Sequence, residues 1–155
     1  MKRISLPAAI TLTEWSERTF FRKFAEGLLS RQTVNGKLML PFDALKAHLC
    51  LALAPEEFFV LEKADAGDAV AQNELALIFL SNNKPKGAIY WLELAARQSN
   101  AEAMSFLSQC YMQGNGVPKD ENMGIMWLAK AAALGHLIAK HQMQGMRAKI
   151  KEAQF

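Results

Sequence analysis

The sequence predicts a mainly α-helical protein, in which a solenoid of stacked helix pairs follows a small unit with one β-hairpin. Two internal alignments predict the solenoid. Residues 67–79 align with residues 99–111 at an offset of 32, and residues 91–99 align with residues 127–135 at an offset of 36. Periods of this length are typical of stacked helical repeats. The hairpin is predicted by an Asn-Gly pair at residues 35–36, because this pair favours a two-residue turn between strands.

The small N-terminal unit is expected to span residues 1–50. Its opening apolar patch is interrupted by Pro7 and soon followed by polar residues, so we interpret it as part of a domain, with a signal peptide as the alternative. Gly27 is expected to end the first clear helix. The expected elements are a helix over residues 16–30, a hairpin over 33–41 and a short helix over 41–49.

The solenoid is expected to span residues 51–150, with residues 151–155 as a tail. Small side chains such as Ala71 and Ala103 let helices approach closely, while leucine and tryptophan side chains fill the space between helix pairs. Each helix pair alone leaves an apolar face open, and stacking buries it. Helices are expected near residues 55–66, 68–81, 85–98, 100–113, 120–134 and 136–150.

Two glycines and a lysine, Gly114, Gly116 and Lys119, contain the ingredients of a phosphate-binding loop. Such a loop ends in Gly-Lys-Ser/Thr, whereas here Pro118 precedes the lysine and Asp120 follows it. The four residues by which the two offsets differ also fall in this segment. We therefore interpret the glycines as part of a connection between helices.

The second of the two aligned repeats, residues 99–135, resembles the Sel1-like repeats, which are bacterial and eukaryotic relatives of tetratricopeptide repeats. The residues that carry this resemblance are Ala103, Leu107, Tyr111, Gly114, Gly116, Val117, Asp120, Trp127, Lys130, Ala131, Ala132 and Gly135. Ser108 departs from the pattern at the first glycine, and Met123-Gly124 stands in place of Lys-Ala. The resemblance implies a right-handed α/α superhelix. It also implies that first helices line a concave groove for a partner protein or peptide.

The sequence supplies candidates for this groove. With Ala71, Leu75 and Phe79 facing the stack, a stripe on the opposite side of the first helices is expected to face the partner. The stripe carries Asn73, Leu77, Leu80, Ser105, Gln109, Met112 and His141. Its apolar members are either an interaction surface or are buried under the N-terminal segment.

Residues 16–49 also resemble the excisionase and MerR-like winged helix-turn-helix family. The resemblance implies a recognition helix that enters the DNA major groove and a wing that touches phosphates. Carried over by position, the recognition helix would hold Arg18, Phe21, Arg22 and Lys23, and the wing would hold Lys37. The family's first helix and turn need about six more residues than residues 10–15 provide, and Glu17 would face phosphate. The alternative is a degenerate winged domain that packs on the repeats or binds another protein.

Composition narrows the class of protein. The chain has 155 residues and a formal net charge of +3, which does not demand an anionic partner. No apolar run approaches the ~20 residues of a membrane span. Cys50 and Cys110 stand alone and suit a reducing compartment, so we expect a cytoplasmic protein.

Catalytic and metal-binding patterns are not evident in the sequence. His136 and His141 are five residues apart, whereas a helical metal pair needs a spacing of four. His48 and Cys50 lack an oriented third group. We therefore expect no enzyme activity, no metal and no cofactor.

Two functions remain. The leading hypothesis is a non-enzymatic adaptor that binds a protein or peptide through its repeats. The alternative is a DNA-binding regulator that uses the N-terminal unit, with the repeats as a homodimerisation or partner-binding module. An accessory domain of an enzyme is a more distant third.

Overall fold

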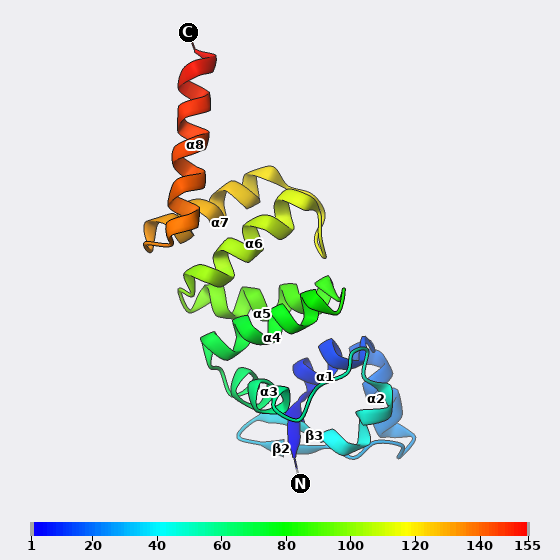
Figure 1. The fold of residues 1–155 in the computed structure, drawn as a ribbon. Coiled ribbons are helices and arrows are strands. Elements are labelled where there is room, and N and C mark those ends of the chain that lie inside the picture. Colours follow the sequence, from blue (N-terminus) through cyan, green and yellow to red (C-terminus); the bar gives the residue numbers. More distant parts are fainter. Residues whose placement is uncertain (1, 155) are drawn as a thin grey trace. The chain divides into compact units, whose positions relative to one another are not determined.

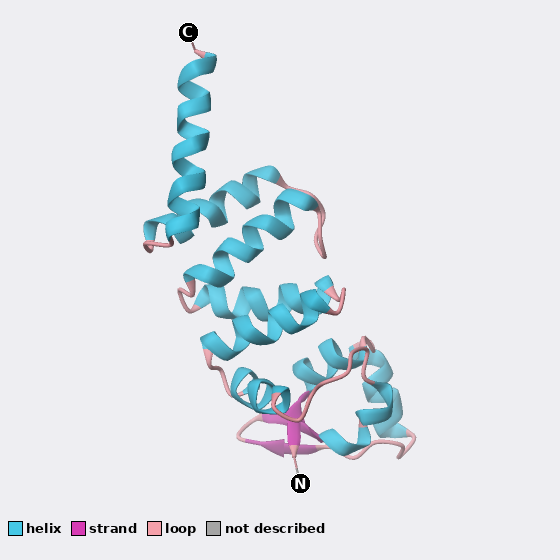
Figure 2. Cartoon of the chain, viewed as in Figure 1, coloured by secondary structure: helices cyan, strands magenta, loops and turns pink. Residues whose placement is uncertain are grey.

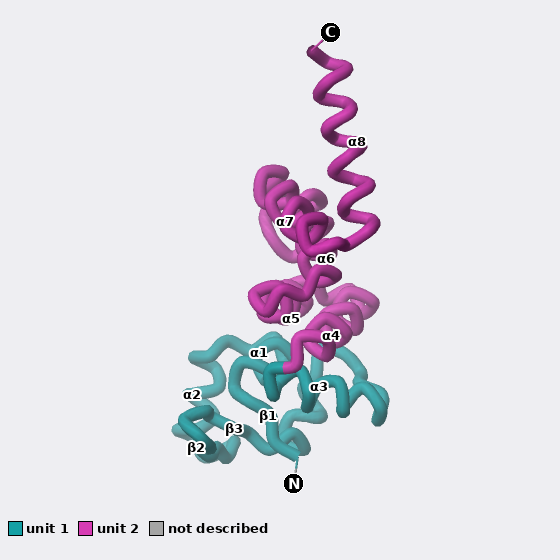
Figure 3. Tube along the Cα trace, turned by 90° about the vertical axis from the view of Figure 1, so that its left-hand side faces the viewer, with its two compact units in different colours: residues 1–67 teal, residues 68–155 magenta. Residues whose placement is uncertain are grey.

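The computed structural model describes residues 2–154, and the chain divides into two compact units after Gly67 (Figure 3). Helices dominate the chain, and the strands of the described part all lie in the N-terminal unit (Figure 2). The two units are described separately below.

The N-terminal unit contains a three-stranded antiparallel sheet with strand order β1-β3-β2. Its strands are β1 (Arg3–Ser5), β2 (Gln32–Val34) and β3 (Lys37–Pro41). The β2–β3 hairpin confirms the expected turn, because Asn35 and Gly36 have φ angles of 50° and 77°. The short strand β1, which pairs with β3, was not expected from the sequence.

Helix α1 (Leu6–Thr13) was not expected from the sequence, although the first residues were expected to belong to a domain. Pro7 does not interrupt the helix but lies in its first turn, where a proline sacrifices no helical hydrogen bond. The hydroxyl of Ser5 caps the helix by accepting a hydrogen bond from the Ala8 amide at 3.3 Å. Helix α1 begins four residues before Ile10, so the first helix and its turn are longer than residues 10–15 alone, though still short of the six extra residues that the winged-helix resemblance requires.

Helix α2 (Glu17–Ala25) is shorter than the expected helix over residues 16–30. Gly27 has a φ angle of 72° and follows the helix closely, as expected of a glycine that ends one. The short helix expected after the hairpin is two successive 3₁₀ turns, η1 (Phe42–Ala44) and η2 (Lys46–His48).

Helix α3 (Glu57–Asp65) belongs to the N-terminal unit, so this unit extends beyond the expected boundary at residue 50. The Asp65 carboxylate accepts hydrogen bonds from the Ser5 amide at 2.7 Å and from the Ser5 hydroxyl at 2.5 Å. These bonds connect α3 to the junction of β1 and α1. The buried core of the unit includes Ile4, Leu12, Phe20, Leu40 and Leu61.

The C-terminal unit is a series of helices in which each packs on the next (Figure 1). They are α4 (Ala69–Ser81), α5 (Pro85–Arg97), α6 (Ala101–Gln113), α7 (Glu121–Ala133) and α8 (Leu137–Ala153). The starts of α4 and α6 differ by 32 residues and those of α5 and α7 by 36, which confirms the helical repeat. Helix α8 continues three residues into the segment expected to be a tail.

The first helices of the repeats begin in the same way. Asp68, Asn100 and His136 each precede a helix and accept a hydrogen bond from the amide three residues later, at 2.9, 2.9 and 3.2 Å. Such caps satisfy one of the free amide groups at a helix start. The buried core then follows the predicted pattern, with Leu75, Phe79, Trp91, Leu92 and Leu107 almost fully buried.

Candidate protein-binding groove

A groove of about 460 Å³ lies between α6 and α8, with α7 contributing to its wall. The residues that line it are Ser108, Gln109, Met112, Gln113, Leu128, Gln142, Gly145, Met146 and Lys149. We call this the α6–α8 groove. Helices α6 and α8 both occupy the first-helix position of the repeat pattern, and the lining includes Gln109 and Met112 of the expected stripe.

The side chains of the α6–α8 groove suit a peptide. Met112 and Met146 are flexible and polarisable, so they can adapt to apolar side chains of different shapes. The amides of Gln109 and Gln142 can each donate to and accept from a peptide backbone. Lys149 adds an ammonium group that can pair with a carboxylate on a partner. The groove therefore combines adaptable apolar contact with polar groups that orient a ligand.

Gly124 explains how Met112 fits against α7. A β-carbon at position 124 would lie 2.8 Å from Met112 Cγ, which is too close for two carbon atoms. The glycine that departs from the alanine of the Sel1-like pattern thus makes room for the long methionine side chain. Met112 is consequently half-buried and packs on α7 as well as lining the groove.

The structure separates the predicted stripe into accessible and inaccessible members. Gln109 is exposed and Met112 is half-buried, and both line the α6–α8 groove. His141 is exposed on α8 but does not line the groove. Leu77 and Leu80 are half-buried on α4.

Asn73 and Ser105 are poor candidates as direct contacts. Their exposed fractions are 3% and 5%, so a partner could not reach their side chains without rearrangement. Asn73 and Ser105 each lie two residues after a buried alanine, Ala71 and Ala103, and are buried with it. The sequence reasoning missed Gln142, Met146 and Lys149, whose only signal was the apolar spacing of α8 at residues 139, 143, 146 and 150.

The residues predicted to bind DNA lie on and beside α2. Arg18, Phe21 and Arg22 are exposed and lie on one face of this helix, because they are three and four residues apart. Lys23 is half-buried, with its Nζ 4.6 Å from the centroid of the Trp15 ring. Lys37 is exposed at the start of β3. The structure therefore groups three of the five residues on one helix face.

Sequence reasoning missed Arg31 beside that helix. Its guanidinium carbon lies 5.6 Å from the centroid of the Phe21 ring and 5.1 Å from that of Phe24. These are cation–π distances. Arg31 thus adds a positive charge next to the exposed aromatic side chain of α2.

Within residues 2–154, no three histidine, cysteine, aspartate or glutamate side chains gather as a metal site would require. No helix in the same part of the chain has the length and apolar character needed to cross a membrane.

Comparison with known proteins identifies the repeats. Residues 69–100 and residues 101–136 each match the model of the Sel1 repeat. Residues 69–136 are two Sel1 repeats. The repeat boundaries coincide with the caps at Asp68, Asn100 and His136, so the Sel1 repeats begin at the start of each first helix.

Two solved structures of Sel1 repeat proteins resemble the chain. A Sel1 repeat protein from Oxalobacter formigenes has 30% sequence identity and a TM-score of 0.54 over 56% of this chain and 26% of that protein. The second is c5321, a protective antigen of uropathogenic Escherichia coli strains that displays an SLR fold. It has 25% identity and a TM-score of 0.55 over 60% of this chain and 21% of that protein. The chain thus spans about a quarter of the length of these proteins.

Sel1 repeats generally mediate protein–protein interaction. The α6–α8 groove combines residues of the second Sel1 repeat with residues of α8, which follows it. The groove is therefore the candidate interaction surface of this unit.

Proposed function

We propose that the protein is a non-enzymatic adaptor that acts in the cytoplasm and binds a partner protein or peptide in the α6–α8 groove. The observation that carries this proposal is the lining of the groove, in which methionine, glutamine and lysine side chains of the Sel1 unit surround one cavity. The sequence has only two cysteines, far apart and outside any Cys-x-x-Cys motif, which suits a reducing compartment.

Capture of a partner with matched variants tests this proposal. The groove variant combines Gln109→Ala with Lys149→Glu, which removes one amide and reverses one charge without touching the core. Met112 is left intact because it packs against Gly124. The control variant combines Glu102→Ala with Asn122→Ala, two exposed positions of α6 and α7 outside the groove.

We expect wild type and the control variant to capture the same partner, and the groove variant to bind it at least about tenfold more weakly, as expected when an interface contact and a charge are lost. Circular dichroism should show equal helical content for all three proteins. Equal affinity of the groove variant and wild type would contradict the proposal.

DNA binding by the N-terminal unit is the second candidate function. It is favoured by the arrangement of α1, a three-residue connection and α2, together with the β2–β3 hairpin. The exposed Arg18 and Arg22 of α2 and Lys37 of the hairpin could contact phosphates or bases.

A titration with random-sequence duplex tests this alternative. A DNA-binding unit should bind at about 50 mM salt, and its affinity should fall steeply with salt because counterions are released from the phosphates. The double variant Arg18→Ala with Arg22→Ala should weaken that binding. The control is the double variant Lys63→Ala with Lys86→Ala, which removes two exposed lysines of α3 and α5 and should leave the binding of duplex unchanged. Failure of wild type to bind duplex at low salt would exclude this function.

A further inference from the structure

The N-terminal unit contains a pocket of about 550 Å³ that neither the DNA-binding hypothesis nor the α6–α8 groove uses. Its lining comes from the residue before β1, from both 3₁₀ turns, from the segment that leads to α3 and from α3 itself. We call it the Lys2 pocket. The lining residues are Lys2, Phe42, Asp43, Lys46, Leu49, Leu53, Ala54, Pro55 and Phe58.

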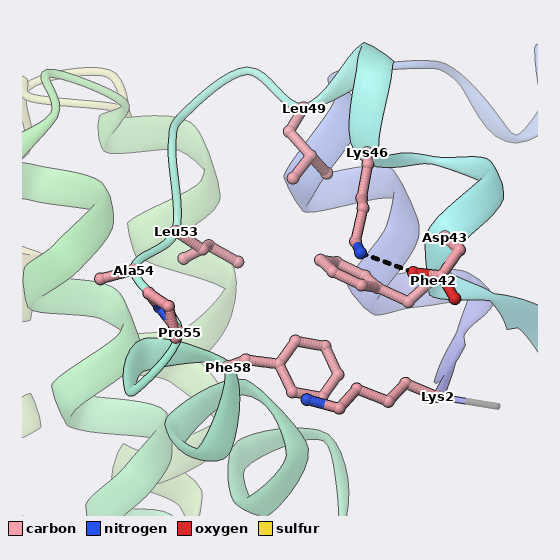
Figure 4. A pocket seen from close by; sticks show the side chains of 9 residues that line it. All are labelled: Lys2, Phe42, Asp43, Lys46, Leu49, Leu53, Ala54, Pro55 and Phe58. Carbon is pink, nitrogen blue, oxygen red and sulfur yellow. Dashed lines mark ion pairs between the residues drawn. The ribbon is translucent and has the colours of Figure 1, made fainter.

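Apolar side chains form the body of the Lys2 pocket. Phe42 and Phe58 are each 5% exposed, and their ring centroids are 4.7 Å apart, so they form a fixed aromatic wall. Figure 4 shows Leu53 and Pro55 across the pocket from Phe42. A ligand in this space would meet carbon surface on two sides.

Two lysines, Lys2 and Lys46, also line the pocket beside its apolar side chains. Lys2 Nζ is 3.9 Å from the centroid of the Phe58 ring and 5.6 Å from that of the Phe59 ring. Lys46 Nζ is 2.7 Å from Asp43 Oδ1 and 6.0 Å from the centroid of the Phe42 ring. Figure 4 shows the Asp43–Lys46 ion pair beside Phe42.

The two lysines differ in what they can still bind. The Lys46 ammonium lowers the pKa of Asp43 by hydrogen bonding and by its charge, so this carboxylate stays ionised and neutralises Lys46. No carboxylate within residues 2–154 forms an ion pair with Lys2, whose ammonium instead contacts aromatic faces. A ring face leaves the ammonium protons available for an anion. The charge of Lys2 also contributes to lowering the pKa of Asp43, so this carboxylate acts on both lysines, and the two lysines and one aspartate of the lining leave a net positive charge.

We propose that the Lys2 pocket binds a small monocarboxylate with an apolar body. The carboxylate of the ligand pairs with the Lys2 ammonium, and its carbon chain or ring lies between Phe42 and Phe58 on one side and Leu53 and Pro55 on the other. The pocket volume falls in the range of about 300–1,000 Å³ that is typical of small-molecule sites.

Charge and polarity disfavour a phosphate ligand. A phosphate dianion would meet the ionised Asp43 in the same lining, and Lys46 is already engaged by that carboxylate. The apolar walls would also leave phosphate oxygens without donors. A single negative charge joined to a hydrocarbon matches both features of the pocket.

Isothermal titration of the 155-residue chain with three probes tests the proposal. Hexanoate carries both the charge and an apolar body, hexanamide keeps the body without the charge, and acetate keeps the charge with little body. We expect hexanoate to bind at least about tenfold more tightly than either of the others, since each lacks one of the two interactions. Amide resonances of residues 42–46 and 53–58 should shift in the NMR spectrum on saturation.

Matched lysine variants locate the charge. Lys2→Met should reduce the affinity for hexanoate to that for hexanamide, whereas Lys63→Met, at an exposed lysine of α3 outside the pocket, should change neither. Leu53→Gln should weaken both probes. Equal binding of hexanoate and hexanamide, unchanged hexanoate affinity in Lys2→Met, or no saturable binding of hexanoate would each overturn the proposal.

Discussion

Gly116 lies directly against Pro85, the first residue of α5. A β-carbon added to Gly116 would lie 2.7 Å from the carbonyl oxygen of Pro85, and the φ angle of Gly116 is 80°. The connection between α6 and α7 therefore rests on the start of the preceding second helix. The glycine is needed for this close approach and for its backbone angle, which supports our interpretation that it belongs to a connection.

Gly116→Ala is expected to destabilise the protein by about 1–2 kcal/mol, because alanine is strained at a positive φ angle. The clash of its β-carbon with the Pro85 carbonyl oxygen should add to this loss. Urea unfolding followed by circular dichroism measures the change. Gly145→Ala is the control. Gly145 lies inside α8 with open space around its β position, so alanine there should stabilise the helix by up to about 1 kcal/mol. Equal effects of the two substitutions would contradict the role of the contact.

Ser99→Gly is expected to stabilise the protein. Ser99 has a φ angle of 65° at the place where Gly67 and Gly135 have angles of 107° and 91° in the neighbouring turns. A serine residue is strained in this backbone conformation, whereas glycine is not. Glycine also makes the unfolded chain more flexible, which offsets part of the gain, so the free energy of unfolding should rise by about 0.5–1 kcal/mol.

The reverse change is the control for this prediction. Nothing lies within 4 Å of the β position of Gly135, so Gly135→Ser tests the backbone angle without a steric clash. It should lower the free energy of unfolding by a similar amount. A destabilised Ser99→Gly variant would show that the serine side chain contributes a contact that outweighs its strain.

The sequence predicted the repeat unit well because the signals there are local and repeated. Alanine, leucine and tryptophan recur at offsets of 32 and 36, and the first helix of each repeat starts with a capping side chain, Asp68 or Asn100. The Asn35-Gly36 turn was predictable for the same reason, since its two positive φ angles depend on the two residues themselves.

The N-terminal unit was harder to predict because long-range contacts define it. Strand β1 has three residues and exists only because it pairs with β3. Asp65 is sixty residues from Ser5, and no local pattern predicts that their hydrogen bonds join α3 to this unit. In the candidate site, Met146 and Lys149 were missed because their position beside α6 depends on how α8 packs.

Trp91→Ala and Trp127→Ala are expected to differ, although the two residues occupy the same place in the repeat. Trp91 is 1% exposed, so its removal should cost about 3–5 kcal/mol through lost burial and a residual cavity. Trp127 is half-buried beside an open cavity of about 450 Å³, so its removal should cost less. Leu107→Ala, at a fully buried position, should cost about 2–5 kcal/mol.

Thermal or urea unfolding of the three variants checks this order. Conservative Trp→Phe substitutions at both positions serve as controls for gross misfolding. A larger loss for Trp127→Ala than for Trp91→Ala would contradict the difference in burial.

Asp65→Ala is expected to destabilise the N-terminal unit by about 1.5–3 kcal/mol, because it removes a charged acceptor from the amide and hydroxyl of Ser5. The Ser5 hydroxyl also caps α1, so loosening it should affect the start of that helix. Hydrogen exchange of the α1 amides measures this local effect. Glu62→Ala, at an exposed carboxylate of the same helix, is the control and should leave α1 unchanged. Equal exchange in the two variants would contradict the prediction.

Stability is expected to decrease at alkaline pH partly because of Cys110 and Tyr111 on α6. Burial raises the pKa of the Cys110 thiol above its ordinary value of 9.0. Burial also raises the pKa of Tyr111 above 10.0, and the charges of Glu93 and Asp120 raise it further. The folded chain therefore keeps both protons at a pH where the unfolded chain has lost them. The free energy of unfolding should be fully retained below about pH 9 and fall as the pH rises above it.

The contribution of Cys110 and Tyr111 can be isolated by comparing the free energies of unfolding of variants and wild type at the same pH. Other titrating groups, such as lysines, contribute equally to each protein and cancel in this comparison. Between pH 8 and pH 10.5, Cys110→Ala and Tyr111→Phe should each lose less stability than wild type, because neither carries the proton that wild type releases on unfolding. Gln113→Ala is the matched control, since it changes an exposed side chain of α6 without removing a titratable group and should leave the slope unchanged. Urea unfolding at each pH gives the slopes, and the same slope in Cys110→Ala as in wild type would contradict a raised thiol pKa.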